Sequence, residues 1–258
     1  MSGSGALRVL LVEDDPVHRL LLGKYLTALS THAEVVADGA AALSLASQRH
    51  FDVIFMDVEM PVLDGLEATR RLRASPLPGP FPPRIIALTG SASAEDRSRC
   101  REAGMDDFLA KPVKKADLAA ALERASRAFS AVVLTPRAPA VAPSPAAPLI
   151  DGPTLRSFLT SLGDDGIGEL METLLANMAT LLHALEAAHQ AGDRDSVRRH
   201  AHSLKSNARM FALGPLGEAC RAIEDTARGE VEGDIDVGVT GLRPLFEASR
   251  AALVREMG

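Results

Sequence analysis

The chain has 258 residues, a length that predicts one or two domains. Its hydrophobic content of 47% is ordinary for a globular protein, and no apolar run is long enough to span a membrane. The net charge is −6, and no long segment is basic, so nucleic-acid binding through phosphate neutralisation has little support. Cys100 and Cys220 lie far apart in helical patterns, so we expect reduced packing residues and a cytoplasmic location.

The first half of the chain alternates between strand and helix patterns. Apolar runs with β-branched members, typical of strands buried on both faces, occupy residues 8–12, 53–57, 84–88 and 107–110. Residues 33–37 show the pattern of a further short strand. Because a helical pattern separates each strand from the next, the sheet should be parallel, with all carboxyl ends at one edge. The expected fold is therefore an α/β doubly wound domain with a five-stranded parallel sheet.

Polar side chains follow four of these strands, at the edge where ligands bind in open α/β sheets. They are Glu13, Asp14, Asp15, Asp57, Thr89 and Lys111. Clustered carboxylates repel one another and need a cation, and hard oxygen ligands suit Mg²⁺. A lysine ammonium and a threonine hydroxyl can hold the oxygens of a phosphoryl group. The pattern therefore predicts that Asp57 is a nucleophile that becomes an aspartyl-phosphate.

Two features near the first strand have simpler explanations. Asp15 precedes Pro16 and a helical run, which favours a helix N-cap over a metal ligand. His18, His32 and His50 occur without a partner pattern, so we expect solvated or half-buried histidines.

These motifs resemble those of a response-regulator receiver domain, and the resemblance covers residues 7 to about 128. The matching segments are Val12-Glu13-Asp14-Asp15-Pro16, Phe55-Met56-Asp57-Val58-Glu59-Met60-Pro61 with Asp64-Gly65, Ala87-Leu88-Thr89, and Phe108-Leu109-Ala110-Lys111-Pro112. The resemblance implies a flavodoxin-like fold with Asp57 as the phosphoacceptor.

The resemblance also implies a metal site at Asp57. Glu13 and Asp14 would be the acid pair that binds Mg²⁺ with Asp57, with Asp14 preferred as the direct ligand. Glu59 would offer its backbone carbonyl to the metal.

Further roles follow from the same resemblance. Thr89 and Lys111 would contact the phosphoryl oxygens, and Thr89 and Phe108 would form a two-state switch, although many relatives have Tyr at the position of Phe108. The Lys111–Pro112 bond would be cis.

Two proline-rich segments interrupt the pattern. Residues 76–83 hold five prolines, and we favour a stiff surface loop over a polyproline ligand. Residues 135–148 also hold five prolines among mostly alanine, which is typical of a semi-rigid linker. The expected division is a receiver domain at 6–129, a linker at 130–149 and a second domain at 150–258.

The second domain shows helical patterns throughout. They cover residues 155–162, 170–191, 193–211, a stretch opened by Pro215, and 242–257. Several helices with short connections indicate an all-α bundle.

One helix of this bundle has a polar face that can carry chemistry. Arg198, His202, Lys205 and Arg209 share a face away from the apolar stripe, which should expose His202 to solvent among three cations. Such surroundings favour an incoming phosphoryl group, and neutral imidazole is a nucleophile for it. His200 lies on nearly the opposite side, and we interpret it as structural. An ordinary solvated basic face is the alternative.

The same helix resembles the motif of a histidine phosphotransfer (HPt) domain, over about residues 150–258. The matching segments are His202-Ser203-Leu204-Lys205-Ser206, Phe211-Ala212 and Leu216 to Glu224. The resemblance implies that His202 is the phosphohistidine and that Lys205 assists it. Ser206 and Ala212 stand where relatives usually have Gly, and Ser206 could crowd the space beside His202.

The sequence therefore predicts a two-component phosphorelay signalling protein. Asp57 would take a phosphoryl group from a sensor or hybrid histidine kinase, and His202 would exchange one with the receiver of a downstream response regulator. The chain would be no enzyme beyond catalysing its own phosphorylation and dephosphorylation. One alternative is a docking module with an inactive His202. Another is an aspartate-nucleophile phosphatase, although such enzymes use a second aspartate two residues after the nucleophile, where this chain has Glu59.

Overall fold

The computed structural model describes residues 7–90, 93–128, 149–162, 167–229, 231 and 234–257. The chain divides into two compact units, Met1–Arg137 and Ala138–Gly258. The predicted linker segment 135–148 lies outside the described residues. Within those residues, none of the helices has both the length and the apolar character needed to cross a membrane.

The first unit is built on one parallel sheet, as predicted. Its strands are β1 (Arg8–Val12), β2 (His32–Val36), β3 (Val53–Asp57), β4 (Arg84–Thr89) and β5 (Asp107–Ala110). They lie in the order β2-β1-β3-β4-β5, and every neighbouring pair is parallel. This order places β1 beside β3 and β3 beside β4, so the carboxyl ends that carry the predicted polar residues are neighbours.

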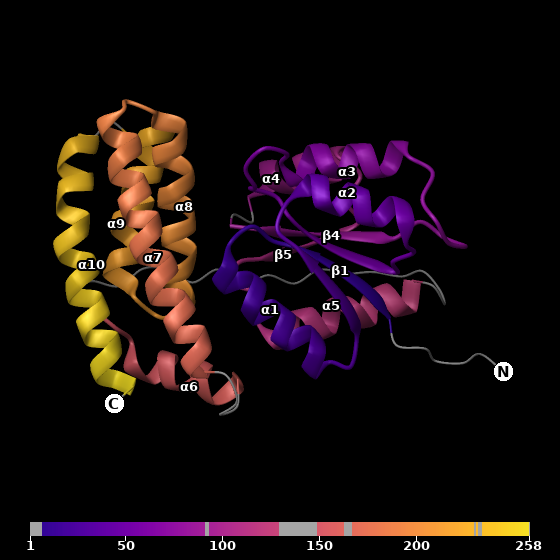
Figure 1. Ribbon diagram of the computed structural model, residues 1–258, viewed down its shortest axis with the longest axis horizontal. Coiled ribbons are helices and arrows are strands. Elements are labelled where there is room, and N and C mark those ends of the chain that lie inside the picture. The colour runs from indigo at the N-terminus through magenta and orange to yellow at the C-terminus, as the bar shows by residue number, and fades with distance from the viewer. Residues whose placement is uncertain are drawn as a thin grey trace. The chain divides into compact units, whose positions relative to one another are not determined.

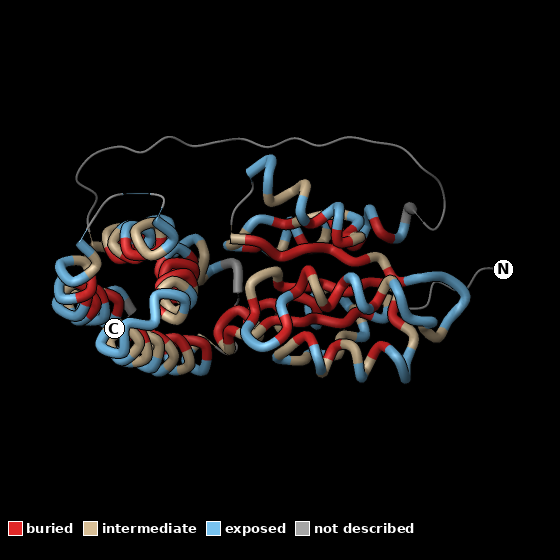
Figure 2. Tube along the Cα trace, turned by 90° about the horizontal axis from the view of Figure 1, so that it is seen from above, coloured by how far each residue is buried: buried red, intermediate tan, exposed pale blue. Residues whose placement is uncertain are grey.

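Five helices cover the two faces of this sheet. They are α1 (Pro16–Ala28), α2 (Gly39–Gln48), α3 (Gly65–Ala74), α4 (Ala94–Glu102) and α5 (Lys115–Ala128). Figure 1 shows α1 and α5 on one face and α2, α3 and α4 on the other. Strands β1, β3 and β4 are almost fully buried between the two helical layers, and Figure 2 shows buried tubes in the middle of this unit, whereas the edge strand β2 is partly exposed. Residues 9–12 and 53–56 accordingly have no exposed surface.

The turns at the carboxyl edge are held by short polar caps. Asp15 caps α1, because its Oδ1 accepts hydrogen bonds from the amides of Val17 at 2.8 Å and His18 at 3.1 Å; the predicted cap is confirmed. Gly65 opens α3 against β3, where a Cβ would lie 1.9 Å from the carbonyl oxygen of Asp57. The Lys111–Pro112 bond is cis, as expected.

The proline-rich loop before β4 bends rather than extending. Gly79 has a φ of +113°, and a Cβ there would lie 2.0 Å from Nδ1 of His50. His50 also lies 3.1 Å from the carbonyl oxygen of Pro78 and 3.2 Å from Asp52. His50 therefore has partners that the sequence did not reveal.

Helices are the only regular secondary structure among the described residues of the second unit. It contains α6 (Gly152–Leu162), α7 (Ile167–Gln190), α8 (Arg194–Met210), α9 (Gly214–Arg228) and α10 (Ile235–Met257). Helix α8 packs against α7 and α9, and α10 packs against α9 and α7, which forms a bundle with its buried sides turned inward (Figure 2). Helix α6 adds an edge-to-face contact between Phe158 and Phe211, with ring centroids 5.3 Å apart.

Helix α10 is longer than predicted. The sequence pattern indicated a start near Leu242, but the helix begins at Ile235 and contains Pro244 in its interior. Val239, Leu242 and Phe246 are all buried, so the apolar stripe continues past the proline. Each buried side chain of this kind contributes roughly 1.5–3 kcal/mol, enough to offset the roughly 3 kcal/mol that an interior proline costs a helix.

Candidate functional site

Three carboxylates meet where β1 and β3 end. Ligand oxygens of Glu13, Asp14 and Asp57 all lie within 4.8 Å of one another. Glu13 has no exposed surface and Asp57 is 3% exposed. Charges this close and this deeply buried repel strongly unless cations lie among them.

Lys111 supplies one cation from the loop after β5. Its Nζ lies 2.7 Å from Oδ2 of Asp57 and 2.9 Å from Oε1 of Glu13, and its side chain is buried. The backbone amide of Lys111 donates to the carbonyl oxygen of Thr89 at 2.7 Å, which fixes the turn that aims the side chain. The structure thus brings together residues from three strand ends that the sequence predicted would converge.

The acids respond differently to this environment. Burial and the charge of Glu13 raise the pKa of Asp57 well above its usual range, and the same two causes raise the pKa of Asp14. Burial also raises the pKa of Glu13, but Lys111 and the neighbouring His18 outweigh it and hold that pKa well below its usual range. One ammonium therefore does not balance three carboxylates. Oxygen donors with uncompensated negative charge fit a hard divalent cation such as Mg²⁺.

The remaining predicted residues of this edge surround Asp57. The backbone amide of Glu59 donates to Oδ1 of Asp57 at 3.2 Å, so Lys111 and Glu59 hold its two oxygens. Thr89 is buried at the end of β4, next to Leu88, which pairs with Asp57 across the strands.

Phe108 is half-buried on β5. The guanidinium carbon of Arg97, on α4, lies 4.5 Å from the centroid of its ring. This cation–π contact joins α4 to the predicted switch residue.

His18 is a correction to the sequence analysis. We expected a solvated or half-buried histidine, but it is 3% exposed and its Nδ1 lies 3.4 Å from Oε1 of Glu13. The cap at Asp15 starts α1 directly after the acids and brings position 18 back against them.

A second polar cluster joins α8 and α9 in the helical unit. Nδ1 of His202 lies 3.0 Å from Oε1 of Glu224 and 3.4 Å from Nζ of Lys205. Lys205 also donates to Oε2 of Glu224, and Arg228 donates to Oε1 at 2.7 Å. His202 is 8% exposed, so the expectation of a solvent-exposed histidine surrounded by cations was wrong: a carboxylate from α9 packs against its ring.

The charge of Glu224 fixes how His202 is oriented. Burial raises the pKa of Glu224, but bonds from His202 and Lys205 lower it to about 2, so this group is a carboxylate at neutral pH. A carboxylate can only accept hydrogen bonds, and Lys205 already directs its ammonium to Oε2. Nδ1 of His202 therefore donates to Glu224, and the lone pair of the neutral ring lies on Nε2.

Two domain models match these two sites. The model of the response regulator receiver domain matches residues 9–123, and that of the Hpt domain matches residues 169–252. The chain contains a response-regulator receiver domain and an Hpt domain. Both domains are phosphotransfer signalling modules.

Relatives of this chain include sensor proteins. The virulence sensor protein BvgS of Bordetella bronchiseptica is 32% identical over 98% of the chain, and the sensor histidine kinase GacS of Pseudomonas protegens is 29% identical over 88%. The chain spans 20% and 25% of these two proteins. Among solved structures, the receiver domain of the sensor histidine kinase PA1611 from Pseudomonas aeruginosa, described with magnesium in its active-site cleft, is 41% identical. The match covers 46% of this chain and 97% of that one, with a TM-score of 0.42.

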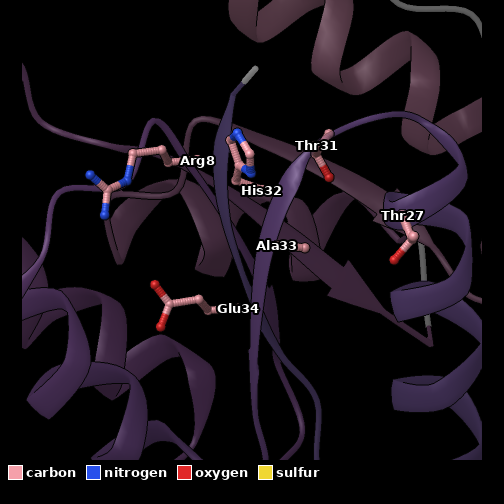
Figure 3. Close-up of a pocket in the computed structure, with 6 residues that line it drawn as sticks. All are labelled: Arg8, Thr27, Thr31, His32, Ala33 and Glu34. Carbon is pink, nitrogen blue, oxygen red and sulfur yellow. The ribbon is translucent and has the colours of Figure 1, made fainter. Parts of the chain in front are cut away.

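A hollow elsewhere on the receiver domain lacks a cluster of side chains like the one around Asp57. It is lined by Arg8, Thr27, Thr31, His32, Ala33 and Glu34, at the amino ends of β1 and β2 and so at the edge opposite the acids. Figure 3 shows Arg8 and Glu34 on one side of β2 and Thr27 on the other. Glu34 is paired with Arg49, and the hydroxyl of Thr27 donates to Gly23. These side chains do not converge on a common point.

The sequence analysis assigned no role to three residues that contact the two sites: Glu224, Arg228 and Arg19. Glu224 was part of a matched segment but had no role, and nothing local indicated that it reaches His202 across 22 residues. Arg228 lies one helical turn beyond Glu224, a spacing that could have signalled the pair. Arg19 donates to backbone carbonyls beside the acids, and no side-chain pattern reveals such a bond.

Proposed function

We propose that Asp57 is the phosphoacceptor of the receiver and that His202 is the phosphohistidine of the Hpt domain. The observation that carries the proposal is the convergence of Lys111 on a buried aspartate at the carboxyl edge of the sheet, at 2.7 Å. Lys111 and Thr89 would bind the phosphoryl oxygens. Thr89 and Phe108 would then form a two-state switch that transmits phosphorylation of Asp57 to the α4 side of the domain.

The acid cluster would hold Mg²⁺ through carboxylates of Glu13, Asp14 and Asp57 and the backbone carbonyl of Glu59. Burial and the charge of Glu13 raise the pKa values of Asp14 and Asp57, and a cation bound among the three carboxylates would offset both effects, which supports this assignment. Bound there, the ion would neutralise charge on the phosphoryl oxygens during transfer.

Transfer to the receiver can be written as a balanced step. A carboxylate oxygen of Asp57 attacks phosphorus of a donor phosphohistidine whose ring is protonated at its other nitrogen. The P–N bond breaks, and the departing nitrogen takes the electron pair, so the ring leaves as neutral imidazole. The product is an acyl phosphate whose charge Lys111 contacts directly.

At the Hpt domain, Nε2 of His202 would attack phosphorus of an aspartyl-phosphate. Glu224 holds the proton on Nδ1 and so stabilises the cationic ring that forms as the N–P bond forms and the carboxylate leaves. Lys205, whose Nζ lies 3.4 Å from Nδ1 of the ring, would add positive charge near the site of transfer.

The partners follow from this chemistry. The donor to Asp57 would be a sensor or hybrid histidine kinase; the relative GacS is named a sensor histidine kinase. The partner of His202 would be the receiver of a response regulator, and the location would be cytoplasmic. The chain would turn over no substrate of its own beyond its phosphoryl groups.

The test uses full-length variants that each keep one site. The His202→Gln chain is labelled with radioactive acetyl phosphate and Mg²⁺, freed of donor, and mixed with the Asp57→Asn chain. We expect alkali-labile label on the first chain and its transfer to the second as alkali-stable, acid-labile phosphohistidine. A mixture with the doubly substituted chain is the control.

Other outcomes would point elsewhere. An Asp57→Asn chain that labels directly from acetyl phosphate as strongly as wild type would exclude Asp57 as the acceptor. Labelled Asp57 without transfer would indicate a docking module with an inactive His202. Steady turnover of an unrelated phosphomonoester would favour the aspartate-nucleophile phosphatase.

A further inference from the structure

The turn that carries the acid pair holds three consecutive carboxylates, Glu13, Asp14 and Asp15. Asp15 is used for the cap of α1, and the amide of Glu13 donates to the carbonyl oxygen of Val36 at 3.2 Å. These bonds fix the two ends of the turn. They leave the peptide units that follow Glu13 and Asp14 to be held by something else.

Arg19 holds both. One guanidinium nitrogen, Nη1, donates to the carbonyl oxygen of Glu13 at 2.9 Å and to that of Asp14 at 2.8 Å. Arg19 lies on the first turns of α1 and is half-buried. Because α1 is anchored by the Asp15 cap and its buried stripe, the guanidinium is a fixed point relative to the sheet.

We propose that Arg19 is a positioning residue for the divalent-cation site, a proposal that rests on the function proposed above. Fixing the two carbonyl groups fixes the peptide planes, and these planes set the directions in which the side chains of Glu13 and Asp14 leave the backbone. Without the clamp, the turn would sample arrangements in which the carboxylates do not share a ligand point, and cation binding would have to restore the order.

Because Arg19 is positively charged, removing it should change the affinity for the cation in opposite directions depending on whether its charge or its positioning role dominates. A guanidinium near a cation site repels the cation, so its removal should strengthen binding if charge dominates. Arg19 bonds the backbone carbonyls of the turn rather than its carboxylates, so its geometric role is separable from neutralisation. If positioning dominates, the neutral variant binds more weakly even though a repulsive charge has been lost.

The experiment compares full-length wild type with Arg19→Gln, Arg19→Lys and Arg49→Gln. Arg49 is the matched control, because it carries the same charge in the same domain in an exposed pair with Glu34. Mg²⁺ is titrated while the backbone amide resonances of residues 13–15 are followed by NMR. Unfolding monitored through Tyr25 fluorescence, with and without Mg²⁺, shows whether each variant is folded.

We expect Arg19→Gln to raise the Mg²⁺ dissociation constant about three- to tenfold. Arg19→Lys, which keeps the charge and can donate to a carbonyl, should recover part of the loss, and Arg49→Gln should stay within about twofold of wild type. A merely stabilising role would lower the unfolding midpoint and leave the dissociation constant unchanged.

Unchanged or tighter binding by a folded Arg19→Gln variant would overturn the proposal. So would a folded Arg19→Lys variant that binds no better than Arg19→Gln. Wild type that shows no Mg²⁺-dependent shifts would instead count against the proposed metal site itself, so the two failures are distinguishable.

Discussion

Neutralising either of two carboxylates that share Lys111 should change stability in opposite directions. Asp57 and Glu13 lie 2.7 and 2.9 Å from the same ammonium, and both are buried. Asp57 faces two other acids, and burial and Glu13 raise its pKa. Glu13 lies between Lys111 and His18, and its pKa is held low. The charged form of Asp57 is therefore costly in the folded state, whereas that of Glu13 is favourable.

We expect Asp57→Asn to stabilise the metal-free receiver by about 1–2 kcal/mol at neutral pH, within the usual range for a single substitution. The change removes a buried charge that two other acids repel, and part of the gain is offset by the lost Lys111 bond. Glu13→Gln should destabilise it by about 2–3 kcal/mol, below the usual cost of breaking a buried pair because Lys111 keeps Asp57. The Asp57→Asn effect should fade as the pH falls through the raised pKa of Asp57. The Glu13→Gln effect should persist to more acidic pH, because the folded-state pKa of Glu13 lies below its unfolded value.

The chain offers a probe that reports on this domain alone. It has no tryptophan and one tyrosine, and Tyr25 lies buried in α1. Denaturant unfolding of the full-length protein, followed by Tyr25 fluorescence in the presence of EDTA, therefore measures receiver stability. Mg²⁺ should then stabilise wild type more than Asp57→Asn. Shifts of the same sign for the two variants, or a destabilised Asp57→Asn, would refute the electrostatic reasoning.

Three further substitutions test local features. Val62 is fully exposed with a φ of 68°, so Val62→Gly should relieve a strained β-branched residue and stabilise the receiver by roughly 0.5–1 kcal/mol in the Tyr25 assay; a loss of stability would contradict this. Ala212 has a φ of 58° between α8 and α9, so Ala212→Gly should stabilise the helical unit by roughly 0.5–1 kcal/mol. The measurement is the unfolding transition that circular dichroism detects and Tyr25 fluorescence does not. Arg97→Ala should cost the receiver roughly 0.5–1 kcal/mol through the lost contact with Phe108, and Arg97→Lys should cost less.

The strands and the acid edge were predictable because their signals are local. A buried parallel strand is a short apolar run, and its carboxyl end is simply the residue that follows it. Asp57 and Lys111 are 54 residues apart, yet each could be placed at the same edge without knowledge of the other. The cap at Asp15 was predictable for the same reason, since its bonds reach two and three residues along the chain.

The contacts that the sequence did not predict depend on which faces of different helices and turns pack together. Helical periodicity placed His202 on a polar face, but it could not show that α9 would bring Glu224 against that face. Periodicity likewise gave no reason to expect His18 beside Glu13. The start of α10 was missed because Gly238, Gly241 and Pro244 weaken the local helical signal, and the packing of its buried stripe overrides them.

The two sites differ in charge balance, and the difference predicts which step needs a metal. At the receiver, three carboxylates face Lys111. At the Hpt domain, Glu224 already contacts two cations, Lys205 and Arg228. A phosphoryl group brought to Asp57 adds negative charge to an anionic site, whereas one brought to His202 meets a site whose carboxylate is compensated. Formation and breakdown of the Asp57 phosphoryl bond should therefore require Mg²⁺, and the survival of phosphohistidine at His202 should not.

A chase experiment separates these requirements. The Asp57→Asn chain, labelled at His202 by transfer, is treated with EDTA and then mixed with unlabelled His202→Gln chain. The label should remain on His202 until excess Mg²⁺ is added, and then move to Asp57 because the acceptor carboxylates become able to receive it. Loss of phosphohistidine on adding EDTA alone would contradict a metal-independent Hpt site. Transfer in EDTA at the rate seen with Mg²⁺ would show that Lys111 is sufficient compensation for the receiver, and the charge argument would fail.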